Sequence, residues 1–305
     1  MNIFTSKPGQ SRRSKNVPIV LIAYILIAVI ATAQDIFGGL KTFLPEGPAY
    51  LRYNNFRIFK LSFYHLVQGK DIYQLFPAEH WDLYKYSPAF ALCFGILSWM
   101  PDSIGLLLWN LINSLCLFFG IRLLPNLSDE RKSWILLFSL LEMLLSIQNT
   151  QSNGLMAGLI VLAFAFAERS KYAWSTLCIV FSFYIKIYGI LALVFYLFYP
   201  GKLRLAAWTI FWMVFFALLP LAAVSTHQLG FLYNSWLSAA AERPVGVDRR
   251  IADGDHGHLV PPVFPEECGH RRRRGIVRAA AGAYPPVQRT IHSASCTSPP
   301  SSSGW

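Results

Sequence analysis

A series of apolar stretches, most about fifteen to twenty residues long, constrains this chain more than any other feature. A bilayer core offers no water to unsatisfied backbone groups, so a chain that crosses it must form long helices. Hydrophobic residues make up 54% of the 305 residues and charged residues only 14%. The sequence therefore predicts an all-α, polytopic integral membrane protein. The expected spans are 18–37, 104–124, 133–149, 153–168, 172–186, 187–200 and 203–224.

The distribution of Lys and Arg predicts the orientation of these spans. The first run is long for a signal peptide, lacks a small-residue cleavage site and ends near Asp35, so we interpret it as a true span. A further apolar segment, 87–100, is shorter than the roughly 20 residues that a helix needs to cross the bilayer. If it does not cross, nearly all positive charges of the short connections share one side with the tail 1–17, and only Lys186 lies opposite. That side is then cytoplasmic. We expect the long loop 39–103 to be extracytoplasmic and 87–100 to dip into the outer face.

The outer loop contains polar and aromatic residues that suit chemistry on a polar substrate. Its first half predicts an amphipathic helix on the membrane, which Gly69 would end. Three loop carboxylates could accept a proton from a sugar hydroxyl, and partial desolvation would raise their basicity: Asp71, Glu79 and Asp82. The alternative is that these acids only offset Lys70 and Lys85 in water. Aromatic residues beside a carboxylate are typical of a sugar pocket, and His80, Trp81 and Tyr84 lie beside Glu79 and Asp82.

Two further groups are expected at the same outer face. Six consecutive polar residues, 148–153, separate two apolar helices. Asn149 or Ser152 could simply cap the second helix, but the amides of Gln151 and Asn153 suit sugar hydroxyls or a diphosphate edge. Lys186, followed by Tyr188, splits an apolar stretch. It either anchors a helix end or neutralises the phosphate of a lipid leaving group.

The composition changes after Leu237. The net charge of +11 is partly due to this tail, 238–305, which contains arginines but no lysines, together with Pro-Pro pairs and a Ser-rich end. We interpret the tail as a disordered segment that is translated from a shifted reading frame. We therefore expect the chain as given to be inactive and poorly stable. A genuine disordered basic tail is the alternative. The other positive charges mostly flank spans, so nucleic acid is not an expected partner, and the five cysteines show no metal-binding spacing.

Several short blocks in this order resemble glycosyltransferase family 87, a mannosyltransferase-like membrane group of GT-C architecture. The blocks are Asn55-Phe56 with Phe59, Gly69-x-Asp71-x-Tyr73, Tyr86-Ser-Pro88, Leu97-x-x-Met-Pro101, Trp109-x-x-Ile112-Asn113, Gln151-x-Asn153 and Lys186-x-Tyr188. The resemblance covers roughly residues 20 to 237. It implies a helical bundle whose long first outer loop carries the catalytic carboxylate.

The resemblance also implies the reaction: a hexose, mannose-like, moves from a polyprenyl-phosphate donor to a lipid or glycan acceptor at the outer face of the inner (plasma) membrane. No cofactor is implied. The family's loop carboxylate corresponds to Asn55, whose amide cannot accept a proton. Either Asp82, Glu79 or Asp71 takes over, in that order of preference, or this branch works differently or not at all.

The substrate would contact a larger set of residues, among which Lys186 faces the phosphate: Asn55, His80, Trp81, Tyr84, Gln151, Asn153, Lys186 and Tyr188. A transporter or flippase for a lipid-linked sugar, or a non-catalytic assembly subunit, would need similar polar groups. Transporters, however, place such groups near the bilayer midplane, and here they cluster at one face.

Overall fold

The computed structural model describes residues 17–43 and 47–241, which all belong to one compact unit of the chain. Most of the expected N-terminal tail, 1–17, lies outside the described residues. So does the expected C-terminal tail, 238–305, beyond Ala241.

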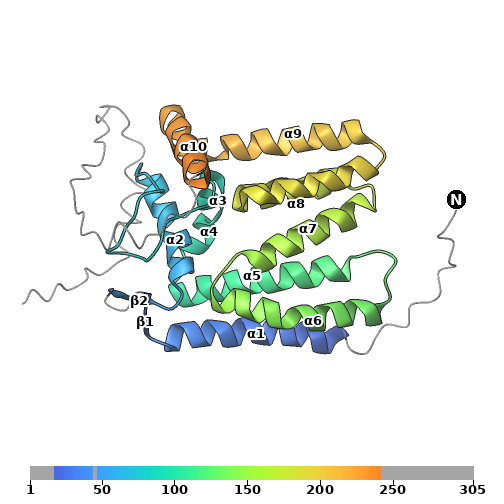
Figure 1. Ribbon diagram of the computed structural model, residues 1–305, viewed down its shortest axis with the longest axis horizontal. Helices are drawn as coiled ribbons and strands as arrows, with labels where there is room; N and C mark the ends of the chain where they lie inside the picture. Colours follow the sequence, from blue (N-terminus) through green and yellow to red (C-terminus); the bar gives the residue numbers. More distant parts are fainter. Residues whose placement is uncertain (1–16, 44–46, 242–305) are drawn as a thin grey trace, which may run out of the picture. The chain divides into compact units, whose positions relative to one another are not determined.

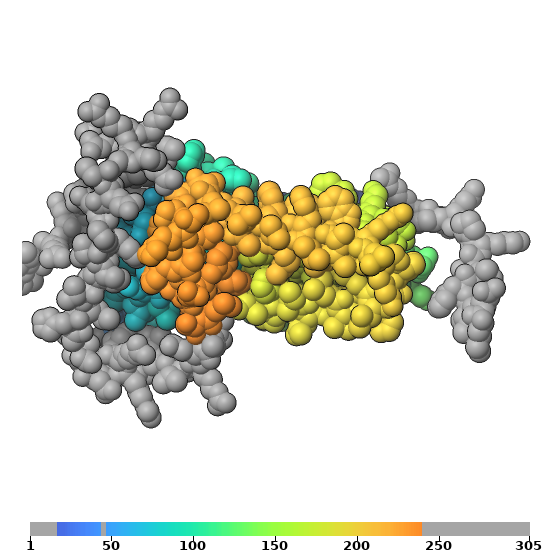
Figure 2. All heavy atoms as spheres, turned by 90° about the horizontal axis from the view of Figure 1, so that it is seen from above, coloured from blue at the N-terminus to red at the C-terminus, as the bar shows by residue number. Residues whose placement is uncertain are grey.

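Long helices lie side by side and form a bundle (Figure 1). They are α1 (Val17–Phe37), α5 (Asp102–Arg122), α6 (Asp129–Gln148), α7 (Asn153–Ala167), α8 (Tyr172–Ile185) and α9 (Lys202–Leu218), with the 3₁₀ helix η1 (Ile187–Phe198) after α8. Shorter elements gather at one end: β1 (Leu40–Thr42), β2 (Ala49–Leu51), α2 (Asn54–Val67), α3 (Pro88–Cys93), α4 (Gly95–Ser98), η2 (Leu219–Ala222) and α10 (Thr226–Ala241). The strands pair antiparallel, with Lys41 opposite Tyr50. Seen from above, α10 crosses this end of the bundle (Figure 2).

Three described helices are long and apolar enough to cross a membrane: Val17–Phe37, Asp102–Arg122 and Lys202–Ala222. Large apolar side chains on α9 are exposed, including Trp208, Phe211 and Val214. Exposed apolar surface on long helices suits lipid contact. Since the described residues are mostly helical and their strands are limited to β1 and β2, the chain is an all-α membrane protein, as the apolar runs predicted.

Two predicted spans differ in detail. Ser128 accepts a hydrogen bond from the Arg131 amide, so α6 begins at Asp129, four residues before the expected start. The expected span 187–200 is a 3₁₀ helix of 12 residues in the structure. At roughly 2.0 Å rise per residue it is about 24 Å long, longer than an α-helix with the same number of residues.

The sequence predicted an amphipathic helix on the membrane surface with its polar face exposed, and the prediction of an exposed polar face is wrong. α2 forms and ends before Gly69, as predicted. However, Lys60 is only 4% exposed, because its Nζ lies 2.6 Å from Asp102 Oδ1 and donates to the Met100 carbonyl. Tyr64 is also buried, and its hydroxyl donates to the Ser98 carbonyl. The polar side of α2 therefore packs against the segment between α4 and α5.

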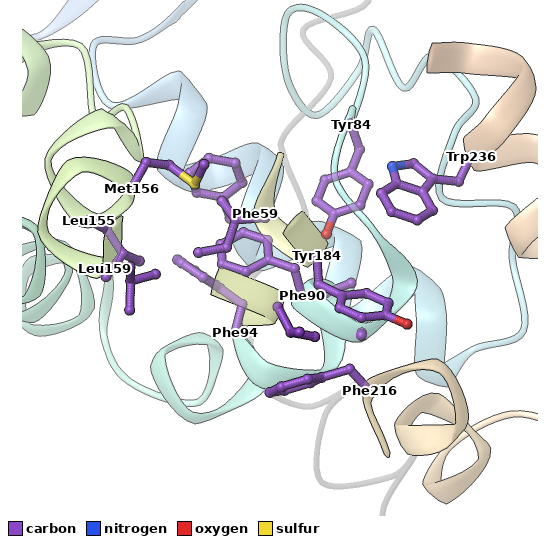
Figure 3. Close-up of a cluster of buried hydrophobic side chains, with 14 of the residues drawn as sticks. Phe59, Tyr84, Phe90, Phe94, Leu155, Met156, Leu159, Tyr184, Phe216 and Trp236 are labelled. Carbon is purple, nitrogen blue, oxygen red and sulfur yellow. The ribbon is translucent and has the colours of Figure 1, made fainter. Parts of the chain in front are cut away.

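An aromatic core fixes the elements of this end to the bundle (Figure 3). Phe59 of α2 lies edge-on to Phe90 of α3 and to Trp109 of α5, with ring centroids 5.6 and 5.4 Å apart. Tyr184 of α8 stacks on Trp236 of α10 at an interplanar angle of 16°. Packing between aromatic rings thus fixes the elements of the loop to the long helices.

The expected dipping segment, 87–100, consists of α3 and α4, which are too short to cross.

Small and amide side chains hold the long helices together. A Cβ at Gly158 of α7 would lie 2.5 Å from the Cys116 backbone, so only glycine permits this approach of α5. Asn113 accepts a hydrogen bond from the Leu155 amide, and Asn110 donates to Thr32. These buried polar groups join neighbouring helices, which is a common role inside membranes.

Candidate functional site

The structure brings the predicted polar segments to one end of the bundle. Consecutive long helices run in opposite directions, so the loop between α1 and α5, the turn 148–153 and Lys186 all lie at the end that carries α2 (Figure 1). This juxtaposition was predicted from the sequence.

A small pocket of about 60 Å³ opens at this end. Its walls come from the end of α1, the β hairpin, the start of α2 and the end of α6. They are lined by Asp35, Lys41, Phe43, Arg52, Asn54, Asn55, Gln148 and Asn149. The pocket thus combines one carboxylate, two cations and four side-chain amides. Amides donate and accept hydrogen bonds, and cations attract phosphate, so the lining suits a polar, anionic ligand.

Hydrogen bonds between the elements hold the pocket walls in place. Gln148 Nε2 of α6 donates to Gln34 Oε1 of α1 at 2.9 Å. Asn55 Nδ2 of α2 donates to the Asn149 carbonyl at 2.7 Å. Asn55, at the position where the resemblance places a carboxylate, is therefore half-buried and held against the polar turn.

Asp35 is the pocket residue that the sequence analysis missed as a functional candidate. Its side chain is 4% exposed, and its Oδ2 has no hydrogen-bond partner among the described residues. The Arg52 side chain lies across Gly38, where a Cβ would come within 2.3 Å of it. Glycine at 38 therefore lets Arg52 lie over the end of α1. The only sequence signal was an acid in the last turn of an apolar span.

Lys186 occupies a second polar cluster at the same end. Its Nζ donates to Asn153 Oδ1 at 2.7 Å and lies 6.0 and 5.9 Å from the ring centroids of Tyr86 and Tyr188. Ser152 donates to the Tyr86 hydroxyl, and burial raises the pKa of Tyr86 to about 12. The structure thus brings together Lys186, Asn153 and Tyr188, three residues that the sequence analysis assigned to the substrate.

The three predicted catalytic carboxylates each have a local partner, and none lines the pocket. Glu79 Oε2 lies 2.9 Å from His65 Nε2, and this contact lowers the pKa of Glu79. Asp71 Oδ1 accepts from the Tyr73 amide at 3.0 Å, while burial raises the pKa of its carboxyl. Asp82 pairs with Lys85 at 2.8 Å and accepts from the Leu83 amide.

The remaining predicted residues differ in how accessible they are. Trp81 stacks on the pocket residue Phe43 at an interplanar angle of 2°, and its backbone exchanges two hydrogen bonds with Asn54. Tyr84 is instead buried in the core, where its hydroxyl donates to the Ser87 carbonyl. His80 is also buried, which lowers its pKa to about 4 and keeps its ring neutral at pH 7. Gln151 is half-buried beside the second cluster.

A family model described as glycosyltransferase family 87 matches residues 84–249, more than half of the 305 residues. The chain belongs to glycosyltransferase family 87. It is therefore an enzyme that transfers glycosyl groups, of the hexosyltransferase type. The matched range includes Tyr84, the polar turn 148–153 and Lys186, while the pocket residues of α1, the β hairpin and α2 precede it.

No curated protein and no solved structure matches the chain. Within the described part of the chain, no three metal-ligating side chains lie together.

Proposed function

We propose that this family 87 enzyme moves a mannose-like hexose from a polyprenyl-phosphate donor to a hydroxyl of a lipid or glycan acceptor. The reaction takes place at the outer face of the inner (plasma) membrane, in a multi-pass bundle of the GT-C type. The partners are thus the lipid-linked donor, the acceptor and the surrounding lipid.

The observation that carries this proposal is the position of the polar groups. The pocket with Lys41 and Arg52, and the cluster around Lys186, lie at one end of an apolar bundle. A polyprenyl chain would lie in the bilayer with its phosphate at that level. Lys186 would then stabilise the departing phosphate, an electrostatic effect that is strong in a dry site. A transporter would need comparable groups near the midplane, so the arrangement favours the transferase.

The opposite end of the bundle supports the orientation. It carries the basic residues Arg122, Arg131, Lys132, Arg169, Lys171, Lys202 and Arg204. Positive charge beside short connections favours the cytoplasmic side. The end with the pocket is then extracytoplasmic.

The general base remains a prediction among Asp82, Glu79 and Asp71. Each would have to leave its present partner, Lys85, His65 or the Tyr73 amide, to accept a proton. Asn55, Trp81, Gln151, Asn153 and Tyr188 remain proposed substrate contacts, with the buried residues His80 and Tyr84 supporting them from the interior.

The test is transfer by membranes that contain an intact version of the protein. They are incubated with labelled polyprenyl-phosphate mannose, and the lipids and glycans are analysed for label. We expect a labelled glycolipid or glycan, which control membranes without the protein do not make. Uptake of the donor into vesicles without transfer would instead support the transporter alternative.

The same transfer experiment tests the expectation that the sequence after Leu237 results from a shifted reading frame. Two versions are compared: the chain as given, and one whose reading frame is shifted by one or two bases near codon 238. If the tail is frame-shifted, the second version encodes further apolar spans and transfers sugar, while the first is inactive. If neither frame encodes such spans, the expectation is wrong.

A further inference from the structure

We infer that Asp35 is the general base of the transfer, in the place of the carboxylate that the family resemblance puts at Asn55. This inference rests on the proposed function. It replaces Asp82, Glu79 and Asp71 in that role.

Asp35 and Asn55 line the same pocket from different elements. Asp35 comes from the last turn of α1, and Asn55 from the first turn of α2. A substrate hydroxyl that met a carboxylate at 55 in other family members would therefore lie in a space that Asp35 also borders. The chain thus keeps one carboxylate in this pocket although position 55 holds an amide.

The contacts of Asp35 do not indicate that it stabilises the fold. Within residues 17–43 and 47–241 it forms no ion pair within 4.0 Å, and its Oδ2 has no hydrogen-bond partner. A carboxylate in the last turn of a helix is also disfavoured by the helix dipole. Burying an acid without such partners costs stability, so its presence suggests a role toward a ligand.

The pocket provides what a base needs. Its low exposure, 4%, keeps bulk water away from the carboxylate. Arg52 and Lys41 line the same pocket and offset its negative charge while a ligand is absent. The volume of about 60 Å³ leaves room for a hydroxyl and its neighbouring atoms but not for a whole disaccharide.

The acceptor hydroxyl gives its proton to the Asp35 carboxylate, and its oxygen forms a bond to the anomeric carbon of the donor sugar. The bond between that carbon and the phosphate oxygen breaks, and its electron pair leaves with the polyprenyl phosphate. Lys186 offsets the charge that the phosphate gains. Asp35 then releases its proton to water.

The first experiment measures transfer and thermal unfolding of Asp35→Asn in the version of the protein that transfers sugar. Because Oδ2 has no hydrogen-bond partner and the carboxylate forms no ion pair within 4.0 Å among the described residues, we expect an unfolding temperature no lower than that of the wild type. We expect transfer to fall about 10²–10⁴-fold, the usual effect of removing a general base. The matched control is Asp129→Asn, an acid at the opposite end that pairs with Arg122 at 3.0 Å. It should keep its rate of transfer.

The second experiment does not depend on turnover. The full chain is treated with dicyclohexylcarbodiimide, which modifies carboxyl groups in apolar surroundings, and peptides are examined by mass spectrometry. We expect an adduct on Asp35 that prior addition of polyprenyl phosphate reduces.

The outcomes separate the two proposals. The wild type here is the version of the protein that transfers sugar; if neither version transfers sugar from polyprenyl-phosphate donors, the proposed function is wrong. If the wild type transfers sugar but Asp35→Asn stays within a few-fold of it, or unfolds at a clearly lower temperature, only the Asp35 inference is overturned. The same holds if Asp35 is not modified, or if polyprenyl phosphate does not protect it. Loss of transfer in Asp82→Asn, Glu79→Gln or Asp71→Asn, with Asp35→Asn active, would return the role to the loop acids.

Discussion

At the scale of single residues, Lys186 connects two turns of the chain. Its Nζ reaches Asn153 at 2.7 Å, and the rings of Tyr86 and Tyr188 lie at its sides. The charge is thereby held against the first residue of α7 and between two tyrosine rings. A fixed cation of this kind can meet a developing phosphate charge without reorganisation.

We predict that Lys186→Met lowers the rate of sugar transfer by about 10²–10³, the effect of removing one preorganised electrostatic group. Lys171→Met, which removes an exposed lysine from the opposite end of the bundle, is the control and should change the rate little. Initial rates with labelled donor at saturation provide the measurement. Equal rates for the two variants would contradict a role of Lys186 toward the phosphate.

At the residue level, the sequence correctly predicted which residues lie close together, while their roles toward a substrate stay predictions. Lys186 and Asn153 were both assigned to the substrate, and the structure places them in contact. The pairing of Asp82 with Lys85 matches the alternative in which the loop acids only offset lysines. The His65 partner of Glu79 was harder to foresee, because only the folded loop brings the two residues together. Asp35 was missed for a related reason. In sequence it is an acid at the end of an apolar run, and only the fold brings Asn55 beside it.

At the scale of elements, α2 is held in place by ion pairs inside the protein, and its polar side does not face water. Lys60 and Arg57 both reach Asp102 at the start of α5, at 2.6 and 3.4 Å. These two ion pairs connect the loop between α1 and α5 to the first turn of α5.

Lys60→Met should therefore lower the free energy of unfolding by roughly 2 kcal/mol, since it removes hydrogen bonds from a charged and mostly buried group. Lys85→Met is the matched control. Its side chain is 56% exposed, and an exposed pair contributes about 0–1 kcal/mol. Thermal or denaturant unfolding in detergent measures both variants. A similar loss for the two would show that the Lys60 pair is not special.

The contact between α5 and α7 gives a second element-level prediction. Gly158→Ala would place a methyl group 2.5 Å from the Cys116 backbone, which should cost about 1–3 kcal/mol by overpacking. Gly230→Ala, in α10, meets nothing within 4 Å and should stabilise by up to about 1 kcal/mol. The unfolding temperature should therefore fall for Gly158→Ala and rise for Gly230→Ala. If Gly158→Ala is neutral, the helices are not held at this distance.

Elements were predictable where their own residues decide the structure. Apolar runs of sufficient length gave the long helices, and Gly69 gave the end of α2. The polar face of α2 was misinterpreted because its partner, Asp102, is 42 residues away from Lys60 and invisible to a helical periodicity. The 3₁₀ form of η1 was likewise not encoded in apolar content alone.

At the scale of the whole molecule, the alternating helices separate a basic end from the end with the pocket. The orientation proposed above makes a direct prediction in a cysteine-free background. A cysteine at Lys70 should react with an impermeant maleimide added to intact cells, and one at Arg131 should not. Both positions are exposed, so reactivity reports their side of the membrane. Lysed cells, in which both cysteines should react, are the control. Modification of position 131 alone in intact cells would invert the topology.

The Gln34–Gln148 hydrogen bond, between residues 114 positions apart, has a consequence for how the protein is made. A ribosome completes α1, the β hairpin and α2 long before the end of α6, so three walls of the pocket are made before the fourth. Asp35 must remain near the lipid headgroups during that interval, because the interior of the membrane repels an unpaired acid. A nascent chain arrested before α6 therefore carries the acid in a pocket that is open on the side of Gln148 and Asn149. Only a chain translated through the polar turn can close this pocket.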